Sequence, residues 1–227
     1  GAGKTQDVHA FKGPATREID CQGMTLAPGF NDAHCHFLAL ASALQGIDCG
    51  PESVTSIRQL IRKVALEAKS AATLQTTQKD GIGWIKAYGY DEFHLGEKRH
   101  PTRWDLDKAA PDTPVRLDHR SGHATVLNSR ALEILGISRD AADPVDGVIE
   151  RDGSNGEPTG MLYEMGRYIR DASRSPQDEE KFLQGVEMAN QLLLSKGITS
   201  IQDAGPNNDI DRWRTFERLK NQRLLDP

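Results

Sequence analysis

The stretch that decides the fold is LAPGFNDAHCH, residues 26–36. Its pattern predicts a buried strand that begins after a Pro-Gly corner and ends in a His-x-His pair. Successive side chains of a strand point to opposite faces, so His34 and His36 project from the same face, about 7 Å apart along the backbone. Histidine is the commonest metal ligand in proteins, and such a pair can reach one ion. Taken alone, the pattern favours two ordinary histidines at a strand end. Whether they bind a metal ion has to be judged from the surrounding sequence.

Asp32 and Cys35, next to the histidine pair, differ in whether they can contribute to a metal site. Asp32 lies two residues before His34 and therefore on the same face of the strand. Its carboxylate either orients a ligand ring through a hydrogen bond or is an ordinary strand-end carboxylate. Cys35 points to the opposite face and is excluded as a ligand. Zinc binds nitrogen and oxygen ligands and keeps a position open for water in catalytic sites, so zinc is the metal that we expect.

The composition is that of an ordinary soluble globular protein. Of the 227 residues, 37% are hydrophobic and 27% are charged, and the net charge is −5. No basic cluster indicates nucleic acid or an anionic membrane, no apolar run approaches the roughly 18–20 residues of a membrane span, and no secretory signal is evident. The three cysteines have no disulfide spacing, which favours a reducing compartment, and we expect the cytoplasm.

Apolar periodicity and breaking residues predict alternating helices and strands along the chain. Helices are expected over residues 38–44, 57–68, 102–110, 130–135, 176–196 and 211–224, and strands over residues 19–26, 84–90, 115–119 and 198–202. Thr102 and Asp105 have the spacing of a capping box, and Asn128-Ser129 is a helix start. Ser175-Pro176-Gln177 is a further helix start. Residues 70–80 and 140–160 are expected to be loops.

Five motifs distributed along the chain resemble one known family. They are residues 28–36, 88–92, 97–107, 121–132 and 197–204, which read PGFNDAHCH, YGYDE, EKRHPTRWDLD, SGHATVLNSRAL and GITSIQDA. Together they resemble amidohydrolase family 3, a subgroup of the amidohydrolase superfamily that includes the N-substituted formamide deformylases. The matches run nearly from end to end and are far more specific than the histidine pair alone.

The resemblance implies an α/β fold, namely the first strands of a (β/α) TIM barrel with an inserted α+β subdomain and a remnant of a β-sandwich. About 160 residues separate His36 from Ile198, which is too long for a simple βα crossover. This length indicates that a subdomain is inserted between the two barrel strands. From the resemblance we expect a β-sandwich remnant over residues 1–25 and the first barrel strand with its helix over 26–80. The inserted subdomain is expected over residues 81–165, and the second barrel strand with its flanking helices over 166–227.

The resemblance also implies the chemistry. Family members hold one or two divalent metal ions that activate water to hydrolyse a non-peptide C–N bond, here of an amide or formamide. His34 and His36 match the first two metal ligands, whereas the other ligands and the general base of the family pattern are expected beyond this chain. Members are about twice as long, so the 227 residues are expected to be a fragment.

Four further residues are weaker candidates for contact with the metal or the substrate. Asp91 lies in a charged loop that favours a solvated, salt-bridged interpretation, and Glu164 is a single carboxylate that can line a cleft. His123 ends a strand of the insertion and is either structural or directed at the substrate. Asp203 closes the second barrel strand, where barrel active sites lie, and is equally interpretable as a turn cap.

Two alternatives to the enzyme hypothesis remain open. The chain can be a non-catalytic truncated domain or pseudoenzyme that needs a partner or the missing C-terminal half. It can also be a self-contained zinc-binding module completed by His123 or Asp203. The expected partners are a small-molecule amide and a second copy or partner segment that completes the barrel, whereas neither nucleic acid nor a membrane is expected.

Overall fold

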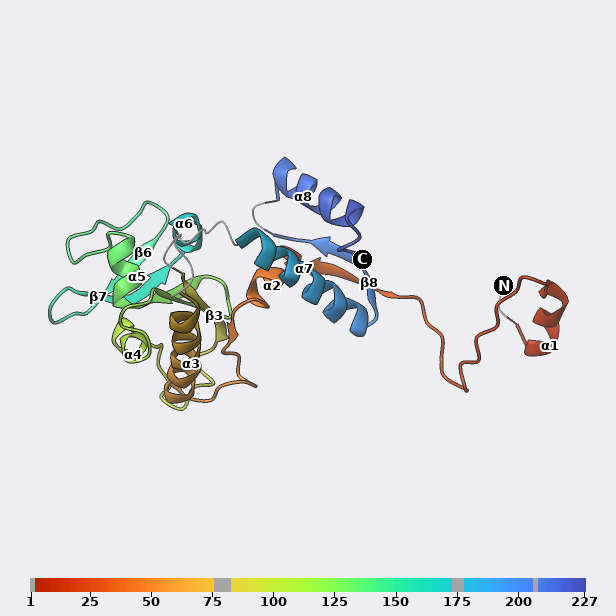
Figure 1. Cartoon of the computed structure of the whole chain (residues 1–227), viewed down its shortest axis with the longest axis horizontal. Helices are drawn as coiled ribbons and strands as arrows, with labels where there is room; N and C mark the ends of the chain where they lie inside the picture. The colour runs from red at the N-terminus through yellow and green to blue at the C-terminus, as the bar shows by residue number, and fades with distance from the viewer. Residues whose placement is uncertain (1–2, 76–82, 173–177, 206–207) are drawn as a thin grey trace.

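The computed structural model describes residues 3–75, 83–172, 178–205 and 208–227, which form two units and an N-terminal tail (Figure 1). In chain order the elements are α1 (Thr5–Val8), η1 (His9–Phe11), β1 (Phe30–Cys35), α2 (Phe37–Ala43), β2 (Ile47–Asp48), α3 (Ile57–Gln75), β3 (Ile85–Tyr90), α4 (Arg103–Asp107), β4 (Val115–His119), β5 (Ala124–Leu127), α5 (Ser129–Ile134), β6 (Val148–Arg151), β7 (Pro158–Tyr163), α6 (Gly166–Ala172), α7 (Asp178–Ser195), β8 (Ile198–Asp203) and α8 (Ile210–Asn221).

The larger unit is built on a six-stranded sheet in the order β2-β3-β4-β5-β7-β6. Strands β2, β3 and β4 are parallel, whereas β4, β5, β7 and β6 are antiparallel neighbours. Helix α3 packs on this sheet because its apolar residues recur every three to four positions, and Leu60 and Val64 are completely buried. The parallel strands β3 and β4 end at the same edge of the sheet, where polar side chains gather.

The smaller unit is the parallel pair of strands β1 and β8. Their register joins residues that are far apart in the sequence, Phe30 with Ile198 and Cys35 with Asp203. Helix α2 packs against α7, and Figure 1 shows α7 and α8 flanking β8. Phe37, Val186 and Leu219 lie in the apolar core of this unit. Each strand is followed or preceded by a helix that packs on it, which is the local order of a (β/α) barrel.

Most of the predicted elements are confirmed. Helix α3 and strands β3, β4 and β8 form where the periodicity places them. Thr102 and Asp105 form the expected capping box of α4, and Asn128 is the N-cap of α5. Gly197 follows α7 with a φ of 74°, a left-handed conformation that favours glycine and ends the helix. The predicted start at Ser175-Pro176-Gln177 lies outside the described residues.

Some expectations about the first strand and the tail are wrong. Strand β1 is largely exposed rather than buried, and Phe30 keeps 63% of its surface accessible. The physical reason is that β1 pairs with β8 on one edge, and no further described strand covers either of the two. No strand forms between residues 12 and 29, which are described throughout and lie exposed apart from Cys21.

Three further segments differ from their predicted structure. Helix α3 continues through residues 70–75, which were expected to be a loop. Strands β6 and β7 form within residues 140–163, where turn residues predicted an irregular connection. Strand β2 pairs with β3, and α3 packs on the larger sheet, so both elements lie with the six-stranded sheet rather than with β1.

Within the described parts of the chain, no helix has the length and apolar character that a membrane crossing requires.

Candidate metal-binding sites

His34 and His36 lie at the carboxyl end of β1, where the sequence predicts them to act together. Their ring centroids are 5.5 Å apart and the rings are nearly perpendicular, at 75°. Both side chains are exposed to solvent. Cys35, between them, packs on the apolar core beside α7, and burial is the main cause that raises the pKa of its thiol. The two imidazoles therefore lie together while the thiol packs on the core, as alternation predicts for these three positions, although β1 has a register shift between Asp32 and Cys35.

Asp203 and Asp32 hold the backbone around the histidine pair. Asp203 ends β8, its Oδ2 accepts the backbone N–H of Phe37 at 2.8 Å, and its Oδ1 accepts that of Gly205 at 2.8 Å. It thereby fixes the first turn of α2, directly after His36. Asp32 Oδ1 accepts the backbone N–H of His34 at 3.1 Å, a contact with the main chain in place of the expected contact with the ring. Among the described residues, neither imidazole of the pair has a hydrogen-bond partner.

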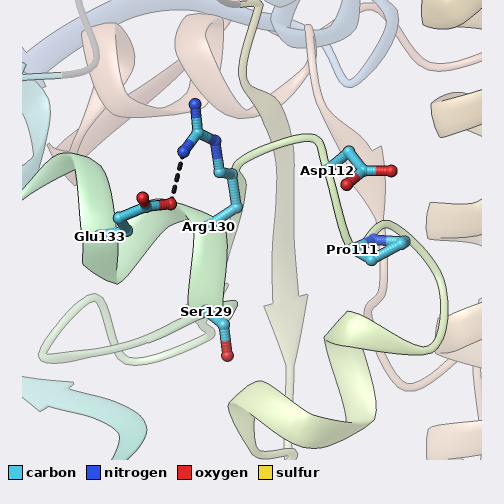
Figure 2. Close-up of a pocket in the computed structure, with 5 residues that line it drawn as sticks. All are labelled: Pro111, Asp112, Ser129, Arg130 and Glu133. Atoms are coloured by element: carbon cyan, nitrogen blue, oxygen red, sulfur yellow. Dashed lines mark hydrogen bonds and ion pairs between the residues drawn. The ribbon is translucent and has the colours of Figure 1, made fainter.

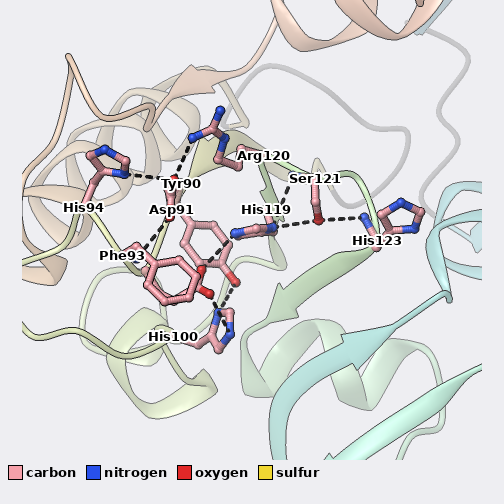
Figure 3. Close-up of polar contacts among 10 residues, drawn as sticks. Tyr90, Asp91, Phe93, His94, His100, His119, Arg120, Ser121 and His123 are labelled. Atoms are coloured by element: carbon pink, nitrogen blue, oxygen red, sulfur yellow. Dashed lines mark hydrogen bonds and ion pairs between the residues drawn. The ribbon is translucent and has the colours of Figure 1, made fainter.

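A second polar group lies at the carboxyl ends of β3 and β4 in the larger unit (Figure 3). Asp91 is only 6% exposed, and its Oδ2 lies 2.8 Å from Arg120 Nη1 and 2.9 Å from His94 Nδ1. The hydrogen bond from Arg120 is the main cause that lowers the pKa of the Asp91 carboxyl to about 2. The salt-bridged interpretation of Asp91 is thus right, but its carboxylate is buried rather than solvated.

Glu92 lies between two imidazoles. Its Oε2 is 2.9 Å from His119 Nε2, and its Oε1 is 3.6 Å from His100 Nε2. The hydroxyl of Tyr90 is 3.1 Å from His100 Nδ1, and the Tyr90 ring stands edge-on to both imidazoles. The sequence-based candidates omitted Glu92, His100 and His119, because they come from separate segments that only the β3–β4 register brings together.

His123 and Glu164 form an exposed pair at the adjoining ends of β5 and β7. His123 Nδ1 lies 2.9 Å from Glu164 Oε1, and the side chains are 70% and 59% exposed. Glu164 has a φ of 57°, which a residue with a side chain seldom adopts, and its backbone N–H donates to the carbonyl of His123 at 2.9 Å. The two sequence-predicted candidates are therefore in direct contact, which their separation in the sequence did not indicate.

A shallow hollow of the larger unit contains none of these candidates. It has a volume of about 360 Å³ and lies at the start of α5, lined by Pro111, Asp112, Ser129, Arg130 and Glu133 (Figure 2). Arg130 is paired with Glu133, and the Ser129 hydroxyl donates to Asp107 Oδ2 at 2.7 Å. Arg130, Glu133 and Ser129 thus already have protein partners, and none of the sequence-predicted candidates lines this hollow.

Comparisons with known proteins agree with the sequence motifs. The chain is 31% identical over 206 residues to the N-substituted formamide deformylase of Arthrobacter pascens, covering 89% of this chain and 36% of that protein. It is 28% identical over 224 residues to the protein LONG AFTER FAR-RED 3 of Arabidopsis thaliana, covering 95% of this chain and 36% of that protein. The chain thus spans about a third of the length of these relatives.

A solved structure supports the fold. The crystal structure of an uncharacterized metal-dependent hydrolase from Pyrococcus horikoshii OT3 matches with a TM-score of 0.53 and 23% identity, covering 88% of this chain and 35% of that one. The expected α/β fold with a partial barrel is thereby confirmed. A model described as the amidohydrolase family matches residues 17–225, nearly the whole chain. The predicted family is confirmed, and the chain belongs to the amidohydrolase family, in the subgroup called family 3.

Proposed function

We propose that this chain is part of a metal-dependent amidohydrolase that hydrolyses a non-peptide C–N bond of an amide or formamide. The observation that carries the proposal is the pair His34 and His36, whose exposed rings lie 5.5 Å apart at the carboxyl end of a parallel strand. In (β/α) barrels the active site lies at this end of the strands. The name of the Arthrobacter pascens relative supports formamides as the substrate class.

The donor set fits a divalent metal, for which zinc is the expected ion. Neither imidazole has a hydrogen-bond partner among the described residues, and Asp203 and Asp32 fix the backbone on either side of them. A metal held by such nitrogens lowers the pKa of a bound water to about 7 and polarises the substrate carbonyl. His34 and His36 would hold the ion at the carboxyl end of β1.

The remaining ligands are proposed to come from further barrel strands outside this chain or from a partner segment. A catalytic zinc site has three protein ligands and an open position, and β1 supplies two. We propose one change to the expected domain division: β2 and α3 belong to the inserted unit, because they pack on its sheet.

Metal removal tests the proposal. The complete protein is expected to hydrolyse N-substituted formamides or amides, to lose this activity after dialysis against a chelator, and to regain it with added zinc. Product amine and protein-bound metal are measured on the same samples. Full activity in a preparation that elemental analysis shows to be free of metal would contradict the proposal.

His123 is proposed to contact the substrate. Glu164 binds its Nδ1, which leaves Nε2 directed to solvent and available for proton transfer. In the complete protein, His123→Ala is expected to lower kcat/KM about 100-fold, the lower range for a general acid or base. The bound metal, measured in parallel, is expected to be unchanged.

A matched variant separates this contribution from a general effect of losing a histidine. His9 is exposed on η1, and His9→Ala is expected to leave kcat/KM unchanged. The role of His123 is disproved when its variant is as active as the His9 variant.

A further inference from the structure

We propose that the acid–histidine group at the carboxyl ends of β3 and β4 is a second metal site, which binds zinc or a similar divalent cation. Its ligands are Asp91, Glu92 and His119, each of which offers one atom within 4.8 Å of the others. None of them belongs to the His34 and His36 pair, so this site is independent of the proposed function. One nitrogen and two carboxylate oxygens are a donor set that zinc accepts.

The position of the site follows from the sheet. Strands β3 and β4 are parallel and their register pairs Tyr90 with His119. Asp91 and Glu92 follow directly after β3, so both carboxylates meet the imidazole at the edge where parallel strands end. Ligand sites of α/β sheets favour this edge, because the loops that leave the strands there supply polar side chains.

Two buried atoms of the group have only each other as a close partner among the described residues. Glu92 Oε2 and His119 Nε2 are buried, lie 2.9 Å apart, and make no well-aligned hydrogen bond. The side chains are only 16% and 14% exposed, so solvent does not replace the missing partner. Buried polar atoms without a hydrogen-bond partner are rare in folded proteins, and each calls for an explanation such as a bound ion. Zinc bonds of about 2.0–2.2 Å place two donors about 3.3 Å apart, so a small widening admits the ion.

Two contacts of His119 with Ser121 bear on which ring nitrogen of His119 carries the proton. Its Nδ1 lies 2.8 Å from the hydroxyl oxygen of Ser121, which can accept the Nδ1–H and leave the Nε2 lone pair directed at Glu92 (Figure 3). Metal-ligating histidines almost always donate their second ring N–H in this way. The backbone N–H of Ser121 lies 3.2 Å from the same nitrogen. That contact favours the other tautomer, in which Nε2–H faces Glu92, and zinc would displace this proton.

The third ligand, Asp91, is shared with Arg120 and His94. Arg120 is 57% exposed and His94 is 55% exposed, so both side chains can turn toward solvent without opening the core. A cation that binds Asp91 would replace the positive charge of Arg120 at a carboxylate that is ionised in any case. Tyr90 and His100 lie on the other side of Glu92, whose side chain is only 16% exposed, so the ion would be bound at a largely buried carboxylate.

Zinc binding to a variant that lacks the β1 pair tests the proposal. The full 227-residue chain with both His34→Ala and His36→Ala is stripped of metal and titrated with Zn²⁺ by calorimetry and with Co²⁺ by visible absorption. One ion per chain is expected. Adding His119→Ala or Glu92→Gln to this background is expected to weaken Zn²⁺ binding at least tenfold. Adding Ser121→Ala removes no ligand but removes the hydroxyl beside His119 Nδ1. It is expected to weaken Zn²⁺ binding about 10-fold or more, as is usual for residues that hydrogen-bond a metal ligand.

Matched substitutions and a stability measurement complete the test. His9→Ala and Glu52→Gln replace the same residue types at exposed positions and are expected to leave the affinity unchanged. Thermal unfolding without metal shows whether each variant is folded, and Glu92→Gln keeps the shape of the side chain if His119→Ala does not fold. The proposal is overturned when the background variant binds no Zn²⁺, as expected if His119 is only an ion-pair partner of Glu92. It is also overturned when the His119 and Glu92 variants bind Zn²⁺ as tightly as the background.

Discussion

Replacing His34 or His36 with alanine is expected to abolish metal binding at the β1 site and hydrolysis by the complete protein. The rings are 5.5 Å apart and have no described hydrogen-bond partner, so their nitrogens are available to a metal ion. A bound divalent metal lowers the pKa of water from 15.7 to about 7, which supplies the hydroxide at neutral pH. Removing a residue that only hydrogen-bonds a metal-ligating histidine lowers metal affinity or activity about 10–100-fold. Removal of a ligand itself is therefore expected to lower kcat/KM at least about 100-fold.

The same variants are expected to remain folded, which separates metal loss from unfolding. Both rings are exposed, and the contacts of β1 with β8 run through the backbone. Thermal unfolding of His34→Ala without metal should therefore match that of the metal-free wild type. His9→Ala is the matched control for metal content and rate. A His34 variant that retains both the wild-type metal content and the wild-type rate rules out the assignment of this pair.

The histidine pair was predictable because its information is local. The spacing of His34 and His36 and the alternation of a strand suffice to place both rings on one face, and the structure agrees. Helix α3 was predictable for the same reason, since Ile57, Leu60 and Val64 recur on one face and are at most 3% exposed. Where a pattern lies within one strand or helix, the sequence alone predicts which side chains share a face.

The Glu92 and His119 pair was not predictable, because it depends on register. Twenty-six residues lie between the two positions, and only the pairing of Tyr90 with His119 across β3 and β4 brings them together. A strand that slipped by one residue would direct His119 to the other face of the sheet. Pairing of this kind is decided by the packing of the whole sheet.

Strands β6 and β7 were missed because tertiary pairing overrides local propensity. Pro158 and Gly160 are turn residues, yet β7 is buried along nearly its whole length between β5 and β6. Gly160 has a φ of 95°, and a Cβ there would lie 2.4 Å from the carbonyl oxygen of Leu127. A glycine that predicts a turn in the sequence is therefore needed here for close approach of two strands.

Replacing Asn128 with alanine is expected to be strongly destabilising, although Asn128 belongs to one of the motifs by which the family is recognised. Its side chain is completely buried. The Oδ1 accepts the backbone N–H of Val115 at 2.9 Å and that of Ala131 at 3.0 Å. The Nδ2 donates to the carbonyl oxygens of Ala110 at 2.7 Å and Thr113 at 2.9 Å. One side chain thus caps α5 and joins it to the start of β4 and to the turn before it.

Alanine at this position leaves four backbone groups without partners. An unsatisfied buried group costs about 1–3 kcal/mol, and the loss of a helix N-cap costs about 0.5–2 kcal/mol. Since local relaxation and water recover part of this, Asn128→Ala is expected to lower the free energy of unfolding by about 4 kcal/mol, a large share of the roughly 5–15 kcal/mol that stabilises a domain. Urea unfolding at neutral pH measures the change.

Asn155 provides the matched control. It is exposed in the turn between β6 and β7, where its Oδ1 accepts the backbone N–H of Glu157 at 2.9 Å. Asn155→Ala is expected to cost less than about 1 kcal/mol, because water can replace the single lost contact. Equal destabilisation by the two substitutions would refute the structural role of Asn128. A large difference would mean that this part of the family motif is explained by folding, because Asn128 keeps β4 and α5 in place behind the strand end that holds His119.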